Sequence, residues 1–182
     1  MLFRSPEKIP ITENSSRKPI NPYGNTKLED EFLAEKYTKE GVSTIGLRYF
    51  NVYGRGQTGT YAGVITKFIN QLKEKKPPII FGNGSQVRDF IFVEDVARAN
   101  ISAMKSNVKS GFFNIGTGIT TSVRELAEQM VILSGIELKP LNEKPLEGDV
   151  SASQADTTLS KKLLGWEYTV QLNDGLKKFF PL

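Results

Sequence analysis

The segment "VSTIGLRYF", Val42–Phe50, is rich in β-branched and apolar residues, which predicts a buried strand. A helix from about Pro22 to Glu40 is expected before it, because proline suits a first helical turn, Asn21 can cap it and Gly41 can end it. The glycine-rich segment "NVYGRGQTGTYAG", residues 51–63, follows and predicts a loop. A helix and a strand joined in this way are building blocks of an α/β protein.

The rest of the chain continues the alternation of helices and single strands. Apolar residues at helical spacing follow the loop and predict a helix there. A second helix is expected to run from Asp95, as its cap, to about Ser106. A third is expected after a capping box at Ser122–Glu125, and a short fourth one at residues 159–165. Residues 77–93, "PPIIFGNGSQVRDFIFV", predict two short strands around an Asn-Gly turn, and residues 111–118, "GFFNIGTG", predict another strand. The predicted fold class is α/β.

Composition narrows the chemistry that the chain can perform. A chain of 182 residues forms one domain, or one large domain with a small lobe. It has no cysteine and no histidine, which excludes disulfides, thiolate nucleophiles, Cys-type zinc sites and a histidine base. We expect no metal site, and any acid–base chemistry must use Tyr, Lys, Asp or Glu. The net charge of +4 is too small to indicate nucleic-acid binding, and no apolar run is long enough to cross a membrane, so a cytoplasmic protein is expected.

Tyr23 and Lys27 are candidates for that chemistry. They lie four residues apart in "NPYGNTK", so both side chains emerge on one face of the predicted helix. An ammonium beside a phenol favours the phenolate and lowers the tyrosine pKa, which makes proton transfer possible. The pair taken alone fits equally well two ordinary surface residues of an amphipathic helix.

The usual cradle for a dinucleotide is not found in the sequence. Neither Gly-x-Gly-x-x-Gly nor Gly-x-x-Gly-x-x-Gly stands at a strand-to-helix turn, where backbone N–H groups would hold a pyrophosphate.

Five motifs, read together, carry a family resemblance. "NPYGNTK", "LRYFNVYGRGQ", "FGNGSQVRDFIFVEDVARA", "FNIGTG" and "LGW" occur in this order between about Pro6 and Phe180. The chain resembles the extended short-chain dehydrogenase/reductase (NAD-dependent epimerase/dehydratase) family. Its nearest branch is the nucleotide-sugar epimerases of the UDP-glucose 4-epimerase type.

The resemblance implies the C-terminal part of a Rossmann-type fold plus a small α/β substrate-binding lobe, with the N-terminal glycine-rich βαβ half absent. Residues 1–60 would be the residual Rossmann-type part, with the Tyr-x-x-x-Lys helix and the following strand. Residues 61–182 would be mainly the nucleotide-sugar lobe, with a strand near 111–116 returning to the Rossmann sheet. The family's catalytic Ser or Thr would fall at or before Met1, and Ser5 is a poor substitute.

The resemblance also assigns roles on the cofactor side. Tyr23 would be the acid/base that acts on a sugar hydroxyl, while hydride moves to and from NAD. Lys27 would lower the tyrosine pKa and hold the nicotinamide ribose, and Tyr49 would also contact the cofactor.

On the substrate side, Asn51 would contact the sugar diphosphate, and capping the loop after the strand is its alternative role. Arg88 would grip the nucleotide phosphates through its fork of donors, with an ion pair to Asp89 or Glu94 as the alternative. Val64 would begin a helix whose backbone N–H groups lie near the nucleotide.

One position departs from the family pattern. Before "EGDV", residues 147–150, the family usually places a second phosphate-binding arginine, and this chain has Leu146. Lys144 is close by and would substitute as a point charge without the bidentate fork. We therefore expect weakened binding of a UDP-sugar.

The implied function is an NAD-dependent 4-epimerase of UDP-hexoses, which oxidises the sugar at C4, lets the keto-sugar rotate and reduces it from the other face. A sugar-nucleotide dehydratase or decarboxylase is the alternative within the family, and a non-catalytic nucleotide-sugar-binding or assembly module is the alternative outside it. The chain alone is not expected to be a competent epimerase. A homodimer is expected through the helix that carries the apolar residues Leu28, Phe32, Leu33 and Tyr37.

Overall fold

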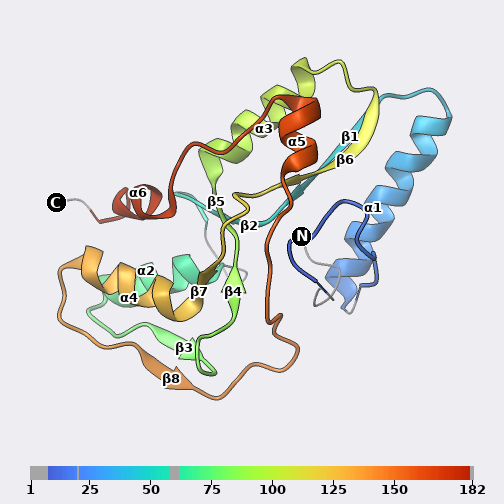
Figure 1. Cartoon of the computed structure of the whole chain (residues 1–182). Coiled ribbons are helices and arrows are strands. Elements are labelled where there is room, and N and C mark those ends of the chain that lie inside the picture. The colour runs from blue at the N-terminus through green and yellow to red at the C-terminus, as the bar shows by residue number, and fades with distance from the viewer. Residues whose placement is uncertain (1–7, 20, 58–61, 181–182) are drawn as a thin grey trace.

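The computed structural model describes residues 8–19, 21–57 and 62–180 (Figure 1). The helices are α1 (Pro22–Lys39), α2 (Val64–Lys73), α3 (Val93–Lys105), α4 (Val123–Ser134), α5 (Thr158–Leu164) and α6 (Leu172–Lys177). The strands are β1 (Thr44–Tyr49), β2 (Asn51–Tyr53), β3 (Ile79–Phe81), β4 (Val87–Arg88), β5 (Phe90–Phe92), β6 (Ser110–Ile115), β7 (Thr121–Ser122) and β8 (Leu141–Glu143). Helices and strands alternate, so the predicted α/β class is confirmed.

The strands pair two by two, and most pairs are parallel. β1 pairs with β6, β2 with β5 and β3 with β8 in parallel, whereas β4 and β7 are antiparallel. In the β1–β6 pair, Gly46 lies opposite Phe112. A Cβ atom at Gly46 would lie 2.4 Å from the Phe112 ring, so this close approach requires glycine.

The strand pairing corrects one expectation. Residues 77–93 do not form a hairpin around Asn83 and Gly84, because β3 pairs with β8 and β5 pairs with β2. Each of the two predicted strands finds its partner far away in the sequence. The Asn83 side chain instead closes a local turn by accepting hydrogen bonds from Ser85.

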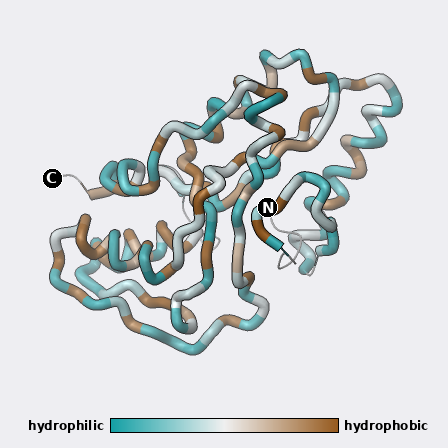
Figure 2. Tube along the Cα trace, in the orientation of Figure 1, coloured by the Kyte–Doolittle hydropathy of each residue, from teal (hydrophilic) through white to brown (hydrophobic). Residues whose placement is uncertain are grey.

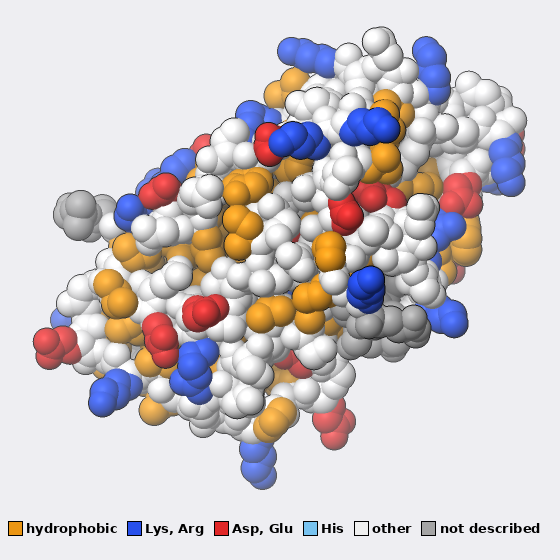
Figure 3. Space-filling view, viewed as in Figure 1, with side chains coloured by type: hydrophobic (Ala, Val, Ile, Leu, Met, Phe, Trp, Pro, Cys, Tyr) orange, Lys and Arg blue, Asp and Glu red, His pale blue; other side chains and the backbone are white. Residues whose placement is uncertain are grey.

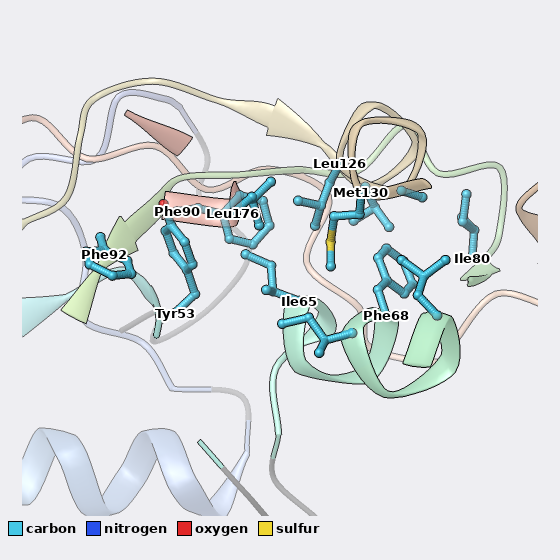
Figure 4. Close-up of a cluster of buried hydrophobic side chains, with 13 residues drawn as sticks. Tyr53, Ile65, Phe68, Ile80, Phe90, Phe92, Leu126, Met130 and Leu176 are labelled. Carbon is cyan, nitrogen blue, oxygen red and sulfur yellow. The ribbon is translucent and has the colours of Figure 1, made fainter. Parts of the chain in front are cut away.

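One apolar cluster lies between α2, α4, α6 and the strands beside them (Figure 4). Ile65 and Phe68 on α2 face Leu126 and Met130 on α4 across this cluster. Figure 2 shows hydrophobic and hydrophilic residues alternating along both helices, as amphipathic helices require. The capping box predicted at Ser122 and Glu125 begins α4, with both of its hydrogen bonds formed.

A second apolar cluster lies between the β1–β6 pair, α3 and α5, and includes Phe113, Ile115 and Trp166. Here the predicted capping role of Asp95 is wrong. Asp95 lies in the first turn of α3, and its buried carboxylate accepts hydrogen bonds from the backbone N–H groups of Thr169 and Val170, at 3.1 Å each. It therefore ties the C-terminal segment to α3.

α1 contacts β1 through charged side chains. Arg48 on β1 donates two hydrogen bonds to the Glu31 carboxylate, at 2.7 and 2.8 Å, and the two side chains are only 8% and 7% exposed. Arg17 donates to the same carboxylate at 3.0 Å. The apolar residues Phe32, Leu33 and Tyr37 are about half exposed instead. The expected apolar stripe is therefore not what holds α1 on the sheet.

A candidate nucleotide-sugar cleft

A cavity of about 940 Å³ opens between the ends of β1 and β2, the start of α2, the strands β3 and β4, and residues 146–153. Five of the residues singled out in the sequence line it: Tyr23, Tyr49, Asn51, Val64 and Arg88. Leu146 lines it as well, whereas Lys27 and Lys144 are not among the described residues that do. Ser5, the weak substitute for the family's Ser or Thr, lies outside the described residues.

Arg88 is a partly buried cation that lines the cavity. Its side chain is 13% exposed and donates to the Asp149 carboxylate at 2.6 Å and to its neighbour's carbonyl at Val87. Burial lowers the pKa of Arg88, and the charge and hydrogen bond of Asp149 oppose that shift. Neither Asp89 nor Glu94, the partners considered from the sequence, forms an ion pair with Arg88 in the described part of the chain.

Asp149 was missed in the sequence, because its partner lies 61 residues earlier and no local pattern joins them. Gln86 also contacts this region: its side-chain amide donates to the Phe81 carbonyl at 3.0 Å and to Asp149 at 3.4 Å. Both residues line the cavity beside Arg88, so a polar end of the cavity is built from β3, β4 and the segment after β8.

Asp89 is a second residue that the sequence did not reveal. It is fully buried, and its carboxylate accepts hydrogen bonds from the backbone N–H groups of Thr117, Gly118 and Ala155, at 2.8 to 3.0 Å. Its own carbonyl accepts from the Asn51 N–H at 3.0 Å. One residue therefore fixes three segments around the cavity, with Arg88 as its neighbour in the chain.

Tyr23 and Lys27 are both on α1, as expected, but the ammonium of Lys27 pairs with Asp30. Tyr23 lines the cavity and is 66% exposed. The Lys27 ammonium lies 6.0 Å from the centre of the Tyr23 ring and donates to Asp30 at 2.5 Å. This bond to Asp30 raises the pKa of Lys27, so the lysine stays charged.

Two other tyrosines line the cavity, and both have partners. The Tyr49 hydroxyl donates to the Asn100 side chain at 3.0 Å. The Tyr53 hydroxyl donates to the Leu172 carbonyl at 3.4 Å, and burial raises the pKa of Tyr53 far above its ordinary range. Tyr53 therefore stays protonated and buried, whereas Tyr23 is the most accessible of the three phenols.

No group of three or more His, Cys, Asp or Glu side chains that could hold a metal occurs among the described residues. The helices within this part of the chain are too short or too polar to cross a bilayer. On the face shown in Figure 3, acidic and basic side chains are interspersed.

Comparison with known proteins agrees with these features. Residues 3–116 match the family model described as the NAD dependent epimerase/dehydratase family. A UDP-glucose 4-epimerase of Mycolicibacterium smegmatis is 32% identical to this chain over 97% of the chain and 57% of its own length.

Two solved structures have the same fold. A Thermotoga maritima UDP-glucose 4-epimerase crystallised with UDP-glucose is 38% identical, with a TM-score of 0.91 over 96% of this chain and 57% of its own. A Bacillus cereus UDP-glucuronic acid 4-epimerase, in complex with UDP-glucuronic acid and NAD, is 30% identical, with a TM-score of 0.89 over 98% and 57%. The chain spans somewhat more than half the length of these relatives.

Proposed function

The chain belongs to the NAD-dependent epimerase/dehydratase family, and we propose that it forms the nucleotide-sugar-binding part of a UDP-hexose 4-epimerase. The observation that carries this proposal is the cavity in which Arg88, Asn51 and the start of α2 meet. These three features are a partly buried guanidinium, a carboxamide and a helix N-terminus, and all of them suit a phosphate group.

In this proposal the cavity holds the substrate by its diphosphate. The Arg88 guanidinium donates to phosphate oxygens, and its present bond to Asp149 shows that it already faces an acceptor on the cavity side. Asn51 stands at the start of β2 and Val64 is the first residue of α2, so each reaches the ligand from a different element. The aromatic and aliphatic lining, including Phe81 and Phe90, accepts the less polar parts of the nucleotide.

Tyr23 would take a proton from a sugar hydroxyl and return it through its phenol oxygen, with Lys27 as electrostatic partner and Tyr49 beside the cofactor. The accessibility of Tyr23 in the cavity supports this role. The hydrogen bond from Lys27 to Asp30 competes with it, because it holds the ammonium of Lys27. Lys27 can stabilise the Tyr23 phenolate only if its ammonium interacts with the phenolate and with Asp30 at the same time.

NAD supplies hydride chemistry in this family, but the described residues do not form an NAD site by themselves. The chain has no glycine-rich strand-to-helix turn to hold the pyrophosphate, and Tyr23 is exposed on α1. We therefore assign no step to NAD in this chain alone, and expect no turnover like that of an intact enzyme. Purified chain incubated with NAD and UDP-galactose should form no UDP-glucose at such a rate, and rapid conversion would contradict this expectation.

The proposed division of the chain follows the same family pattern. Residues 1–60 form the Rossmann-type part, and residues 61–182 form mainly the nucleotide-sugar lobe. The parallel pairing of β6 with β1 supports the return of residues 110–115 to the first part. A cytoplasmic location is part of the same proposal.

The test of the proposed function is binding of UDP. Titration calorimetry of the whole chain should show weak binding, and Arg88→Ala should abolish it, because a lost charge-assisted hydrogen bond costs about 1.5–3 kcal/mol. Arg124→Ala is a matched control, since Arg124 pairs with the Asn83 carbonyl and does not line the cavity. UDP binding that Arg88→Ala leaves unchanged would place the site elsewhere.

A non-catalytic nucleotide-sugar-binding or assembly module is the second candidate function. The commitment of Lys27 to Asp30 favours it, because a lysine so held stabilises the Tyr23 phenolate less. This candidate predicts UDP binding without any epimerisation, even when the N-terminal segment of a family relative is supplied as a separate chain.

A further inference from the structure

Of the two cations that line the cavity among the described residues, one already has an ion-pair partner. Among the described residues, Arg88 and Lys67 are the cations that line it, and Asp149 is the anion. Arg88 already pairs with Asp149 at 2.6 Å. A nucleotide diphosphate carries at least two negative charges, so Arg88 alone leaves it undercompensated.

Lys67 lies at the start of α2, where the helix dipole would stabilise the negative charge of a bound ligand. It is in the first turn of α2, where its backbone N–H makes the first helical hydrogen bond, to the Gly63 carbonyl at 3.2 Å. Gly63 has no side chain to cap the helix, and no acidic residue lies in the first turn. A lysine near the positive end of a helix dipole is unfavourable unless an anion is present.

The Lys67 side chain is also uncommitted. Within the part of the chain that the structure describes, it forms no ion pair and no side-chain hydrogen bond, in contrast to Lys27, Lys76 and Lys178. Its ammonium is therefore available to a ligand without breaking an existing contact.

A separate observation, at Ser153, supports a polar ligand in this cavity. The hydroxyl of Ser153 is buried, with the residue 1% exposed, and it has no hydrogen-bond partner among the described residues. Ser153 lines the same cavity as Lys67. An unsatisfied buried hydroxyl is costly, and a ligand that bonds to it would remove the cost.

Lys144, which the sequence suggests as a replacement for the missing arginine, lies farther from the cavity lining than Lys67 does. Lys144 is exposed and is not among the described lining residues, whereas the uncharged Leu146 is. We propose that Lys67 supplies the second positive charge for the diphosphate of the nucleotide sugar, in place of the arginine that the family has where this chain has Leu146. This inference rests on the proposed function.

The test compares three lysine variants of the whole chain by titration with UDP and with uridine. Lys67→Met should weaken UDP binding about tenfold at low salt, the size expected for one charge-assisted contact, and should leave uridine binding unchanged. Lys67→Arg should retain most of the UDP affinity. Lys144→Met, the matched control, should have no effect. Raising the salt from about 0.05 M to about 0.5 M should reduce the difference between wild type and Lys67→Met.

Leu146→Arg provides a rescue. Placed in the Lys67→Met background, it should restore UDP affinity, because it returns a cation to the same ligand group. UDP binding that Lys67→Met leaves intact would overturn the role of Lys67 while the proposed function stands. Equal loss of uridine binding would also overturn it, since the effect would then not lie in the phosphates. Wild-type chain that binds no UDP would overturn the proposed function itself, and this inference with it.

Discussion

α1 lies on β1 through a buried ion pair, whereas α2 and α4 enclose a cluster of apolar side chains. The Glu31–Arg48 contact depends on two hydrogen bonds with defined geometry, and the exposed side of α1 still carries Phe32, Leu33 and Tyr37. The cluster between α2 and α4 depends on excluded water and on filled volume. The comparison shows that helices of one small protein can be held by opposite means, α1 by an ion pair and α2 with α4 by apolar packing, with different sensitivity to substitution.

The largest expected effect lies in the apolar cluster. Phe68 is 1% exposed and packs between α2 and α4 (Figure 4). Phe68→Ala should lower the free energy of unfolding by about 3–5 kcal/mol, because it removes apolar contacts and leaves a cavity. Urea unfolding followed by circular dichroism measures the loss. A loss below about 1 kcal/mol would mean that the cluster collapses around the substitution.

The second effect lies on the α1 side. Arg48→Met should cost roughly 3 kcal/mol, because it leaves the buried Glu31 carboxylate with Arg17 as its remaining ion-pair partner. The double variant Glu31→Leu with Arg48→Met should lose less than Arg48→Met alone, since no buried charge is then left uncompensated. If the double variant loses as much as the two single variants added together, the ion pair is not what fastens α1.

A third substitution tests the exposed side of α1. We propose that the chain forms a homodimer or larger assembly through this helix, on which Phe32 is 52% exposed. Phe32→Glu should weaken self-association about tenfold or more, because it puts a charge where apolar surface is buried. Sedimentation at several protein concentrations measures the change, with Ile132→Glu on α4, which is also exposed, as the control. A wild-type chain that stays monomeric at high concentration would contradict the proposed assembly.

The smallest effect is expected at the start of α4 and depends on pH. Hydrogen bonds from the Ser122 backbone and side chain lower the pKa of Glu125 below its usual range. A lowered folded-state pKa contributes stability above the unfolded-state pKa, and this contribution is lost as the pH falls through the folded-state value. Glu125→Gln should therefore be slightly less stable than wild type near pH 7 and equal to it at strongly acidic pH. Thermal unfolding at both pH values checks this, and a difference that persists in acid would exclude ionisation of Glu125 as the cause.

Local patterns in the sequence were enough for most of the helices. Pro22, the capping box at Ser122 and Glu125, and Gly165 act within a single turn, and the structure has helix ends at these residues. The α/β class followed from the same local signals.

Contacts between distant residues could not be predicted in this way. The Asn-Gly turn suggested a hairpin, but β3 found its partner in β8, which lies about 60 residues further along the chain. Asp95 looked like a cap because an acidic residue suits a helix start, and only tertiary contacts with residues 169 and 170 reveal its role.

In the candidate site, too, contacts between residues far apart in the sequence could not be predicted. Arg88 and Asn51 are identified through motifs, and Gln86 lies in the same motif as Arg88, but Asp149 and Lys67 line the cavity from distant parts of the chain. Their grouping arises because β4, α2 and the segment after β8 converge in space.

The opposite orientations of the adjacent residues Arg88 and Asp89 limit which insertions and deletions this region tolerates. Arg88 lines the cavity, whereas the carboxylate of the next residue holds the backbone of residues 117, 118 and 155 inside the protein. Because neighbouring side chains in an extended segment point to opposite sides, a slip of one position would exchange the two. A guanidinium would then enter the interior and a carboxylate would face the cavity. Insertions or deletions between β3 and β4 are therefore tolerated only where the turn absorbs them completely, which makes this short segment a poor place for grafted loops or tags.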